Sequence, residues 1–204
     1  MVTNGEPDMT RKVEFFYDFG SPTAYLAFKR LPSIAARHGA TILYRPFLLG
    51  GVFKAVGTHS PVENAAKGDW MWRDLQRFAA RDGIPMARNP HFPINTLPIM
   101  RGAMVAARDD VLVPYSEAMF DAIWRDGKNL GDPAVIGAVI GAADLDPKRY
   151  FAGVDETDIK NALKASTEEA IARGAFGAPT FFVGGEMHFG QDRLDFVEAA
   201  LLAA

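Results

Sequence analysis

Short apolar runs near the start of the chain predict two β-strands with a helix between them. Residues 13–19 (VEFFYDF) are rich in aromatic side chains, which is typical of a buried strand, and residues 41–47 (TILYRPF) predict a second one. Ser21 and Pro22 are favoured at a helix start, and helical spacing then continues to Gly39. Because a β-α-β unit joins its strands by a right-handed crossover, we expect these strands to be parallel.

The middle of the chain has helical spacing. Helices are predicted at residues 69–81, 99–108, 114–125, 133–143 and 155–173, several of them opened by Asp or Pro. Residues 84–98 contain four prolines and predict an extended loop. Pro32 is expected to kink or split the first helix, and Gly50-Gly51 to form a turn before a short helix. No strand is predicted between Gly50 and Phe176.

Strand patterns return at the end of the chain. Thr180–Val183 and Glu186–Phe189 flank the pair Gly184-Gly185, which predicts a hairpin, and a last amphipathic helix begins after Gly190. The order is β-α-β, a helical block, then β-β-α. It predicts an α/β fold of thioredoxin-like type. We expect a discontinuous thioredoxin-like domain at 11–55 and 174–204, with an α-helical domain inserted at 56–173.

Composition excludes several classes of function. The chain has 204 residues, is 49% hydrophobic and carries a net charge of −3, which is typical of a globular protein and not of a nucleic-acid binder. No signal-like or membrane-length apolar segment is present, so a cytoplasmic protein is expected, and residues 1–10 predict a loose tail. There is no cysteine, and the four histidines lack metal-ligand spacing. Any thiol chemistry therefore needs a thiol-bearing cofactor.

The start of the first predicted helix is the main candidate for chemistry. Its unpaired N–H groups and positive dipole end favour an anion, and the Ser21 hydroxyl can donate a hydrogen bond to a bound thiolate. The ordinary alternative is that Ser21 only caps the helix. Pro179, just before the third strand, is expected to be cis, so that the backbone of Ala178 faces the same site. A trans proline is the alternative, because cis bonds are uncommon.

Two weaker candidates carry charge. The N–H groups at Gln191 and Asp192, where the last helix begins, suit a carboxylate, and the Asp192 side chain suits an ammonium group. Asp192 is equally explained by stabilising its own helix. Lys67 is placed to bind a second carboxylate, and its alternative is an ordinary solvated lysine.

Together, five segments resemble a known family. They are FFYDFGSPTAYLA, PFLLGGVFKAVG, AAKGDWMWRDLQRFA, GIPM…FPINTLP and GAFGAPTFFVGGEMHFGQDRLDFVEAAL. They are similar to 2-hydroxychromene-2-carboxylate isomerases and to the related kappa-class glutathione transferases, which share a DsbA-like thioredoxin fold. The resemblance runs from Val13 to Leu202 in the same order. The Cys-x-x-Cys motif of DsbA is missing, which excludes disulfide exchange.

The resemblance implies that the cofactor is glutathione. The positions that match its contacts are Ser21, Pro22, Thr58, Lys67, Ala178, Pro179, Gln191 and Asp192. It implies that Ser21 holds the sulfur and is the catalytic group, and that the backbone of Ala178 binds the cysteinyl part. Gln191 and Asp192 would hold the γ-glutamyl group, and Lys67 the glycine end.

Two features depart from this match or extend it. Thr58 stands where kappa-class enzymes carry an asparagine, which leaves that contact open. Isomerase-like chains have a loop rich in proline and asparagine after Ile84, and here Asn95 and Arg101 are expected to meet a substrate carboxylate, because arginine binds carboxylates through paired hydrogen bonds. The alternative is a loop asparagine and an arginine on a helix surface.

The resemblance implies an isomerase. Its substrates would be cyclic hemiketal acids of the 2-hydroxychromene-2-carboxylate type, and its products trans-o-hydroxybenzylidenepyruvates, formed during aromatic degradation with glutathione regenerated. A homodimer is implied as well. No nucleic acid, membrane or metal partner is expected. Two alternatives remain open: a kappa-like transferase that conjugates glutathione to electrophiles, and a non-catalytic module that binds glutathione or a peptide.

Overall fold

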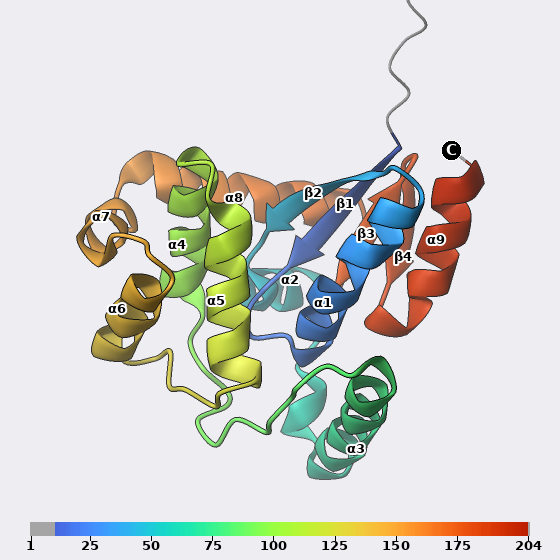
Figure 1. The fold of residues 1–204 in the computed structure, drawn as a ribbon, viewed down its shortest axis with the longest axis horizontal. Coiled ribbons are helices and arrows are strands. Elements are labelled where there is room, and N and C mark those ends of the chain that lie inside the picture. The colour runs from blue at the N-terminus through green and yellow to red at the C-terminus, as the bar shows by residue number, and fades with distance from the viewer. Residues whose placement is uncertain (1–10, 204) are drawn as a thin grey trace, which may run out of the picture.

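The computed structural model describes residues 11–203, so the tail predicted at 1–10 lies outside the described residues (Figure 1). The elements are β1 (Lys12–Tyr17), α1 (Pro22–Arg37), β2 (Thr41–Pro46), α2 (Leu49–Val56), α3 (Ala65–Asp82), α4 (Leu97–Arg108), α5 (Leu112–Trp124), α6 (Pro133–Ala142), α7 (Pro147–Gly153), α8 (Thr157–Ala172), β3 (Thr180–Val183), β4 (Glu186–Phe189) and α9 (Leu194–Ala203). Short 3-10 turns lie at Pro61–Glu63 and Gln191–Arg193.

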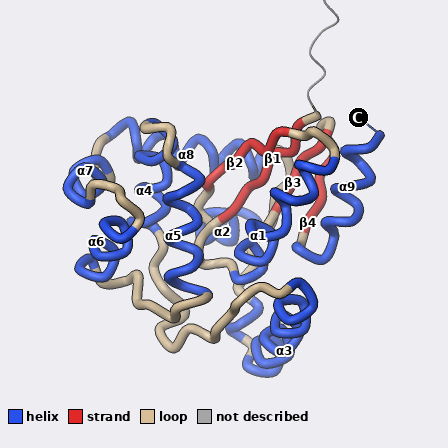
Figure 2. The backbone as a smooth tube through the Cα atoms, viewed as in Figure 1, coloured by secondary structure: helices blue, strands red, loops and turns tan. Residues whose placement is uncertain are grey.

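A four-stranded sheet in the order β2-β1-β3-β4 forms the centre of the molecule (Figure 2). β1 is parallel to β2, β3 is antiparallel to β1, and β4 pairs antiparallel with β3. The predicted parallel pair and C-terminal hairpin are therefore confirmed, as is the thioredoxin-like fold class. The central position of β1 accounts for its composition, since Phe15, Phe16 and Tyr17 are all fully buried.

Successive aromatic residues of β1 pack into two different layers. The Tyr17 ring lies 5.6 Å from Phe120 of α5 and 6.4 Å from Phe28 of α1. On the other face, the Phe16 ring contacts Phe182 at 5.7 Å, and Arg173, which follows α8, stacks over Phe182 at 3.6 Å. Helices thus cover both faces of the sheet, and β1 ends inside the core, between α1 and the helices that follow.

Between α2 and β3 the described residues form helices and loops and no strand, as expected. In Figure 1, α4 to α7 lie to the left of the sheet and α3 lies below it. The helix α7 was missed. Asp146 caps it and Pro147 opens it, but only Tyr150 and Gly153 of its seven residues are buried, too few to give a periodic pattern. The predicted division into a thioredoxin-like domain and a helical domain at 56–173 stays a proposal. α8 belongs to the helical block but packs on β2 and α2 of the other part.

Two local predictions differ from the structure. Pro32 does not split the first helix: α1 continues through it, and the nearby Leu31 and Ile34 are buried, so packing outweighs the lost hydrogen bond. Gly50 and Gly51 lie inside α2 rather than in a turn before it. A Cβ on Gly51 would stand 3.3 Å from the Thr167 side chain, so glycine there permits the close approach of α2 and α8. Across residues 11–203, no helix is both long and apolar enough to cross a membrane.

Candidate active site

The loop between β1 and α1 fixes the position of the Ser21 hydroxyl. Ser21 has extended backbone angles, its Oγ accepts a hydrogen bond from the N–H of Ala24 at 3.1 Å, and Pro22 is the first helical residue. The predicted cap is therefore present. Ser21 is 4% exposed, so its environment is almost entirely protein.

Two hydroxyl groups share one backbone acceptor beside this cap. Ser21 Oγ donates to the carbonyl oxygen of Ala178 at 3.0 Å, and Thr23 Oγ1 donates to the same oxygen at 2.9 Å. The two hydroxyl oxygens lie 2.8 Å apart. The peptide bond between Ala178 and Pro179 is cis, as expected. Because Thr23 alone can satisfy this carbonyl, the hydrogen of Ser21 can turn to another acceptor without leaving a buried group unpaired.

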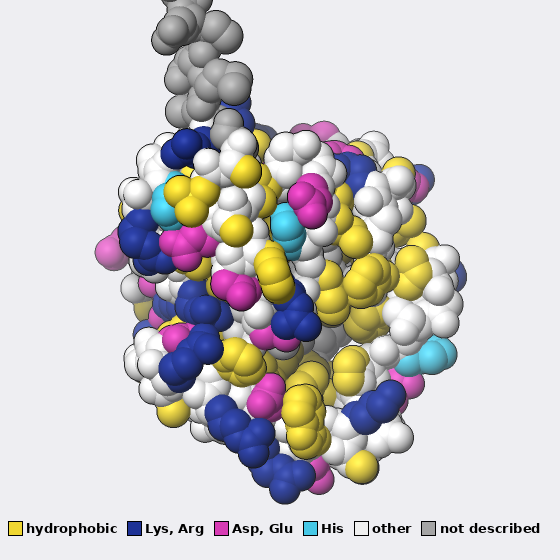
Figure 3. All heavy atoms as spheres, turned by 90° about the vertical axis from the view of Figure 1, so that its right-hand side faces the viewer, with side chains coloured by type: hydrophobic (Ala, Val, Ile, Leu, Met, Phe, Trp, Pro, Cys, Tyr) yellow, Lys and Arg dark blue, Asp and Glu magenta, His cyan; other side chains and the backbone are white. Residues whose placement is uncertain are grey.

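A cavity of about 260 Å³, the Ser21 cavity, opens beside these groups. It is lined by Gly20, Ser21, Pro22, Thr23, Leu49, Phe53, Thr58, His59, Ser60, Pro61, Val62, Met71, Phe92, Phe176, Gly177, Ala178 and Phe189. Hydrophobic side chains gather around a hollow on the side of the molecule that Figure 3 shows. Most of the lining is apolar, so the few polar groups in the wall determine which ligand atoms it accepts.

A shallower hollow continues from the Ser21 cavity and contains Lys67. The two share Thr58, His59, Ser60 and Pro61, and the hollow has a volume of about 600 Å³. Ser21, Thr58 and Lys67 therefore lie along one continuous depression.

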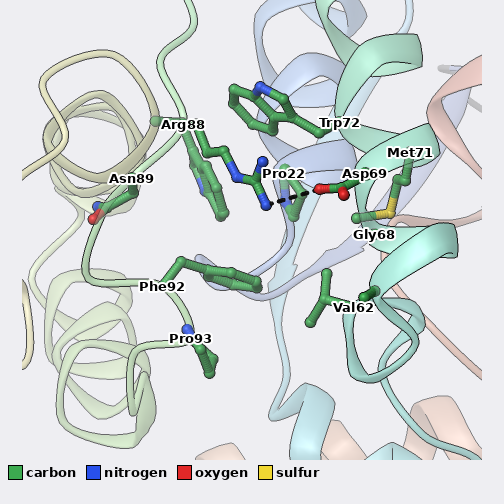
Figure 4. A pocket seen from close by; sticks show the side chains of 12 residues that line it. Pro22, Val62, Gly68, Asp69, Met71, Trp72, Arg88, Asn89, Phe92 and Pro93 are labelled. Atoms are coloured by element: carbon green, nitrogen blue, oxygen red, sulfur yellow. Dashed lines mark hydrogen bonds and ion pairs between the residues drawn. The ribbon is translucent and has the colours of Figure 1, made fainter.

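An aromatic cavity of about 290 Å³ lies on the other side of Pro22 (Figure 4). It shares Pro22, Val62, Met71 and Phe92 with the Ser21 cavity, and is completed by Ala65, Gly68, Asp69, Trp72, Arg88, Asn89, Pro93 and Trp124. Trp72 lines it, whereas Trp70 is 57% exposed, because residues two apart in a helix do not face the same side.

The predicted γ-glutamyl contacts do not line the Ser21 cavity. Gln191 is 4% exposed, and both its backbone oxygen and its Oε1 accept hydrogen bonds from Arg30 Nη1, at 2.9 and 3.1 Å. The Asp192 carboxylate is paired with Arg193 at 2.7 Å. Ser21, Pro22, Thr58 and Ala178 line that cavity, Lys67 adjoins it, and Gln191, Asp192 and Pro179 stand outside its wall.

Asn95 and Arg101 are not brought together at one carboxylate site. Asn95 is exposed, and its Oδ1 accepts a hydrogen bond from the N–H of Leu97 at 3.1 Å, where α4 begins. Arg101 lines a cavity of about 790 Å³ between α2, α4 and α8, with its guanidinium 3.7 Å from Asp155. That cavity shares no lining residue with the Ser21 cavity.

Asp18 is a buried carboxylate that anchors the Ser21 loop. It is 1% exposed, and it accepts hydrogen bonds from the N–H groups of Gly20 at 2.8 Å and Leu49 at 2.9 Å. Burial raises its pKa, although these hydrogen bonds act in the opposite direction. Sequence reasoning did not single out Asp18 or Thr23, because a lone aspartate or threonine near a cap gives no signal until its distant partner is known.

Comparisons with known proteins agree with the fold. Residues 12–202 match the family of DSBA-like thioredoxin domains. The 2-hydroxychromene-2-carboxylate isomerase of Sphingobium xenophagum is 31% identical over 95% of this chain and 100% of its own. Human glutathione S-transferase kappa 1 is 28% identical over 93% of this chain and 90% of its own.

A solved 2-hydroxychromene-2-carboxylate isomerase structure superposes with a TM-score of 0.86 at 30% identity, covering 94% of this chain and 95% of the other. Both the sequence and the arrangement of the elements are therefore shared over nearly the full length. The chain belongs to the DSBA-like thioredoxin family and, within it, to the family of the 2-hydroxychromene-2-carboxylate isomerases.

Proposed function

We propose that this protein is a glutathione-dependent isomerase that converts 2-hydroxychromene-2-carboxylate-type hemiketal acids to trans-o-hydroxybenzylidenepyruvate-type products. One observation carries the proposal: a serine hydroxyl with a transferable hydrogen bond lies at the N-terminus of α1, in the wall of a cavity, in a chain without cysteine. The isomerases named above support the reaction class. A homodimeric state and a cytoplasmic location remain predictions from the sequence.

The groups in the depression suit a thiol-bearing peptide. The sulfur would lie at Ser21, where the first turn of α1 presents N–H groups without helical partners and the positive end of its dipole. The backbone of Ala178 lines the same wall, and the ammonium of Lys67 adjoins it for a terminal carboxylate. Binding of the γ-glutamyl end by Gln191 and Asp192 stays a prediction, since neither lines the cavity.

When bound, glutathione supplies a thiol that adds reversibly to a conjugated carbon, so that a double bond becomes a rotatable single bond. The protein's part is to hold the sulfur as an anion. Ser21 would donate a hydrogen bond to that anion, the N-terminus of α1 would lower the thiol pKa, and Thr23 would keep the Ala178 carbonyl hydrogen-bonded meanwhile. The apolar lining excludes water, which strengthens each of these interactions.

The test is the stoichiometry of glutathione. The purified protein is incubated with 2-hydroxychromene-2-carboxylate and a small fraction of one equivalent of glutathione, and S-methylglutathione, which has no free thiol, is the matched control. We expect complete isomerisation with glutathione recovered unchanged, and none with the control. Loss of one glutathione per product, with a thioether adduct in the mass spectrum, would instead show a transferase. Isomerisation that is independent of glutathione would reject the proposal.

A further inference from the structure

The aromatic cavity and the Ser21 cavity form adjoining chambers. They share Pro22, Val62, Met71 and Phe92, and these residues come from α1, the turn at Pro61–Glu63, α3 and the loop before α4. Pro22 follows Ser21 directly in the chain. A molecule in the aromatic cavity would therefore lie next to a ligand that is bound at the Ser21 hydroxyl.

Three aromatic rings, those of Trp72, Phe92 and Trp124, line the aromatic cavity, and two of them are held in place. The Phe92 and Trp124 rings lie 5.3 Å apart, and Trp124 is fixed because its Nε1 donates to the Phe19 carbonyl at 2.8 Å. The loop that carries Phe92 is held by the buried Asn89, whose Nδ2 donates to two backbone carbonyls. Such preformed apolar walls suit a planar ring, because the side chains in the walls lose little conformational freedom when the ring binds.

Arg88 provides a positive charge at the rim of this cavity. In Figure 4 its guanidinium lies between Trp72 and Phe92 and points to Asp69, and the Nη2 to Oδ1 distance is 3.2 Å. The Arg88 side chain is 64% exposed and that of Asp69 62%, so the pair is a weak surface contact. Among the residues that line the two chambers, Arg88 is the only lysine or arginine.

We propose that the aromatic cavity is the subsite for an aryl carboxylate. The ring packs against Trp72, Phe92 and Trp124, and the carboxylate replaces Asp69 as the partner of Arg88, because a planar guanidinium binds a carboxylate through two parallel hydrogen bonds. Arg88 then has the role that the sequence suggested for Arg101. The inference rests on the proposed function only for which substrate binds here. That the subsite accepts an aryl carboxylate follows from its own residues.

Binding of a non-reactive probe tests the subsite without glutathione. The probe is 2-naphthoate, its neutral isostere is 2-naphthamide, and quenching of tryptophan fluorescence reports occupancy. We expect Arg88→Leu to weaken naphthoate binding about 10-fold, to the level of naphthamide, and Arg88→Lys to restore part of the loss. Asp69→Asn should tighten binding, because it removes the competing carboxylate; loss of a purely structural ion pair would not do so.

Arg77→Leu is the matched control. Like Asp69, Arg77 lies on α3; it is 68% exposed, pairs with Asp74 at 3.2 Å as Arg88 pairs with Asp69, and lines neither chamber. We expect it to leave naphthoate binding unchanged. Equal effects of Arg88→Leu and Arg77→Leu, or wild-type protein that does not bind naphthoate, would overturn the inference.

Turnover separates this inference from the proposed function. If the protein isomerises the chromene acid and Arg88→Leu leaves KM unchanged, the subsite is wrong and the isomerase stands. If naphthoate binding depends on Arg88 but glutathione supports no isomerisation, the subsite stands and the proposed function fails.

Discussion

Two helix starts in this molecule have similar sequence signals and different surroundings. α1 begins after Ser21, whose hydroxyl lies in the wall of a cavity and shares its acceptor with Thr23. The turn before α9 presents Gln191 and Asp192, but Arg30 takes both oxygens of Gln191, and Arg193 pairs with Asp192. At α1, Ser21 can turn its hydrogen bond from Ala178 to a ligand. Before α9, the side chains of Gln191 and Asp192 are already bonded to other protein groups.

The difference shows that a helix N-terminus is not by itself a binding site. At both termini the first backbone N–H groups lack a helical partner and the dipole end is positive, although the Ala24 N–H of α1 is already bonded to Ser21 Oγ. Arg30 lies 161 residues before Gln191 in the chain, so only the folded structure shows that the oxygens of Gln191 already have a partner. The availability of each terminus depends on its tertiary neighbours.

The largest expected effect is that of Ser21→Ala at the α1 start. Loss of a donor to an anion in a water-poor site typically costs about 10²–10³ in rate, so we expect kcat to fall by about that factor. The lost cap should lower the free energy of unfolding by only about 1 kcal/mol. Steady-state kinetics and denaturant unfolding measure the two. A near-wild-type kcat would remove the hydroxyl from the mechanism.

Next in size is Thr23→Val. Without the Thr23 hydroxyl, Ser21 becomes the sole side-chain donor to the Ala178 carbonyl, and turning away would leave that buried oxygen unpaired. We expect kcat to fall about 10-fold, since such a group costs roughly 1–3 kcal/mol. Thr23→Ser should restore the rate. If Thr23→Val and Thr23→Ser had the same kcat, the Ala178 carbonyl that Ser21 and Thr23 share would have no role in positioning Ser21.

A smaller effect is expected at the far end of the depression. Lys67→Met keeps the length of the side chain but removes the charge opposite the proposed carboxylate. We expect the KM for glutathione to rise about 5-fold with kcat unchanged, because an exposed ion pair contributes up to about 1 kcal/mol. The wild-type KM should rise with salt, and that of the variant should not. A change in kcat alone would contradict this assignment.

The smallest effect is expected at the α9 start. Asp192 is half exposed and already paired with Arg193. We expect Asp192→Asn to change the affinity for glutathione less than 3-fold, as is usual for exposed ion pairs. Isothermal titration measures it. A loss of 10-fold or more would show that Asp192 exchanges Arg193 for the ligand, and the contrast between the two helix starts would then be wrong.

Most of the sheet could be predicted because its signals are local. The aromatic run of β1 and the glycines between β3 and β4 identify those strands without knowledge of the rest of the fold. The errors came where packing outweighs local preference. Pro32 is tolerated inside α1, where its neighbours are buried, and Gly51 lies within α2, where the absence of a side chain lets α8 approach closely.

The site was predictable only in part, for the same physical reason. Ser21 and Pro179 stand next to recognisable helix and strand boundaries. Thr23 acts on Ala178, which is 155 residues away, and Arg88 is set apart from other surface arginines only by the cavity at which it lies. In the sequence Arg101 is as plausible a carboxylate ligand as Arg88, but in the structure it lines a different cavity.

The thiol pKa of bound glutathione is the most direct measure of whether Ser21 and α1 hold a sulfur anion. It is read from the ultraviolet absorption of the thiolate as pH is raised, with S-methylglutathione as the blank. With the wild-type protein we predict a pKa at least about 1 unit below that of free glutathione, and with Ser21→Ala a return toward the free value. Identical titration curves for free glutathione, the wild type and the variant would contradict a thiolate at this helix start.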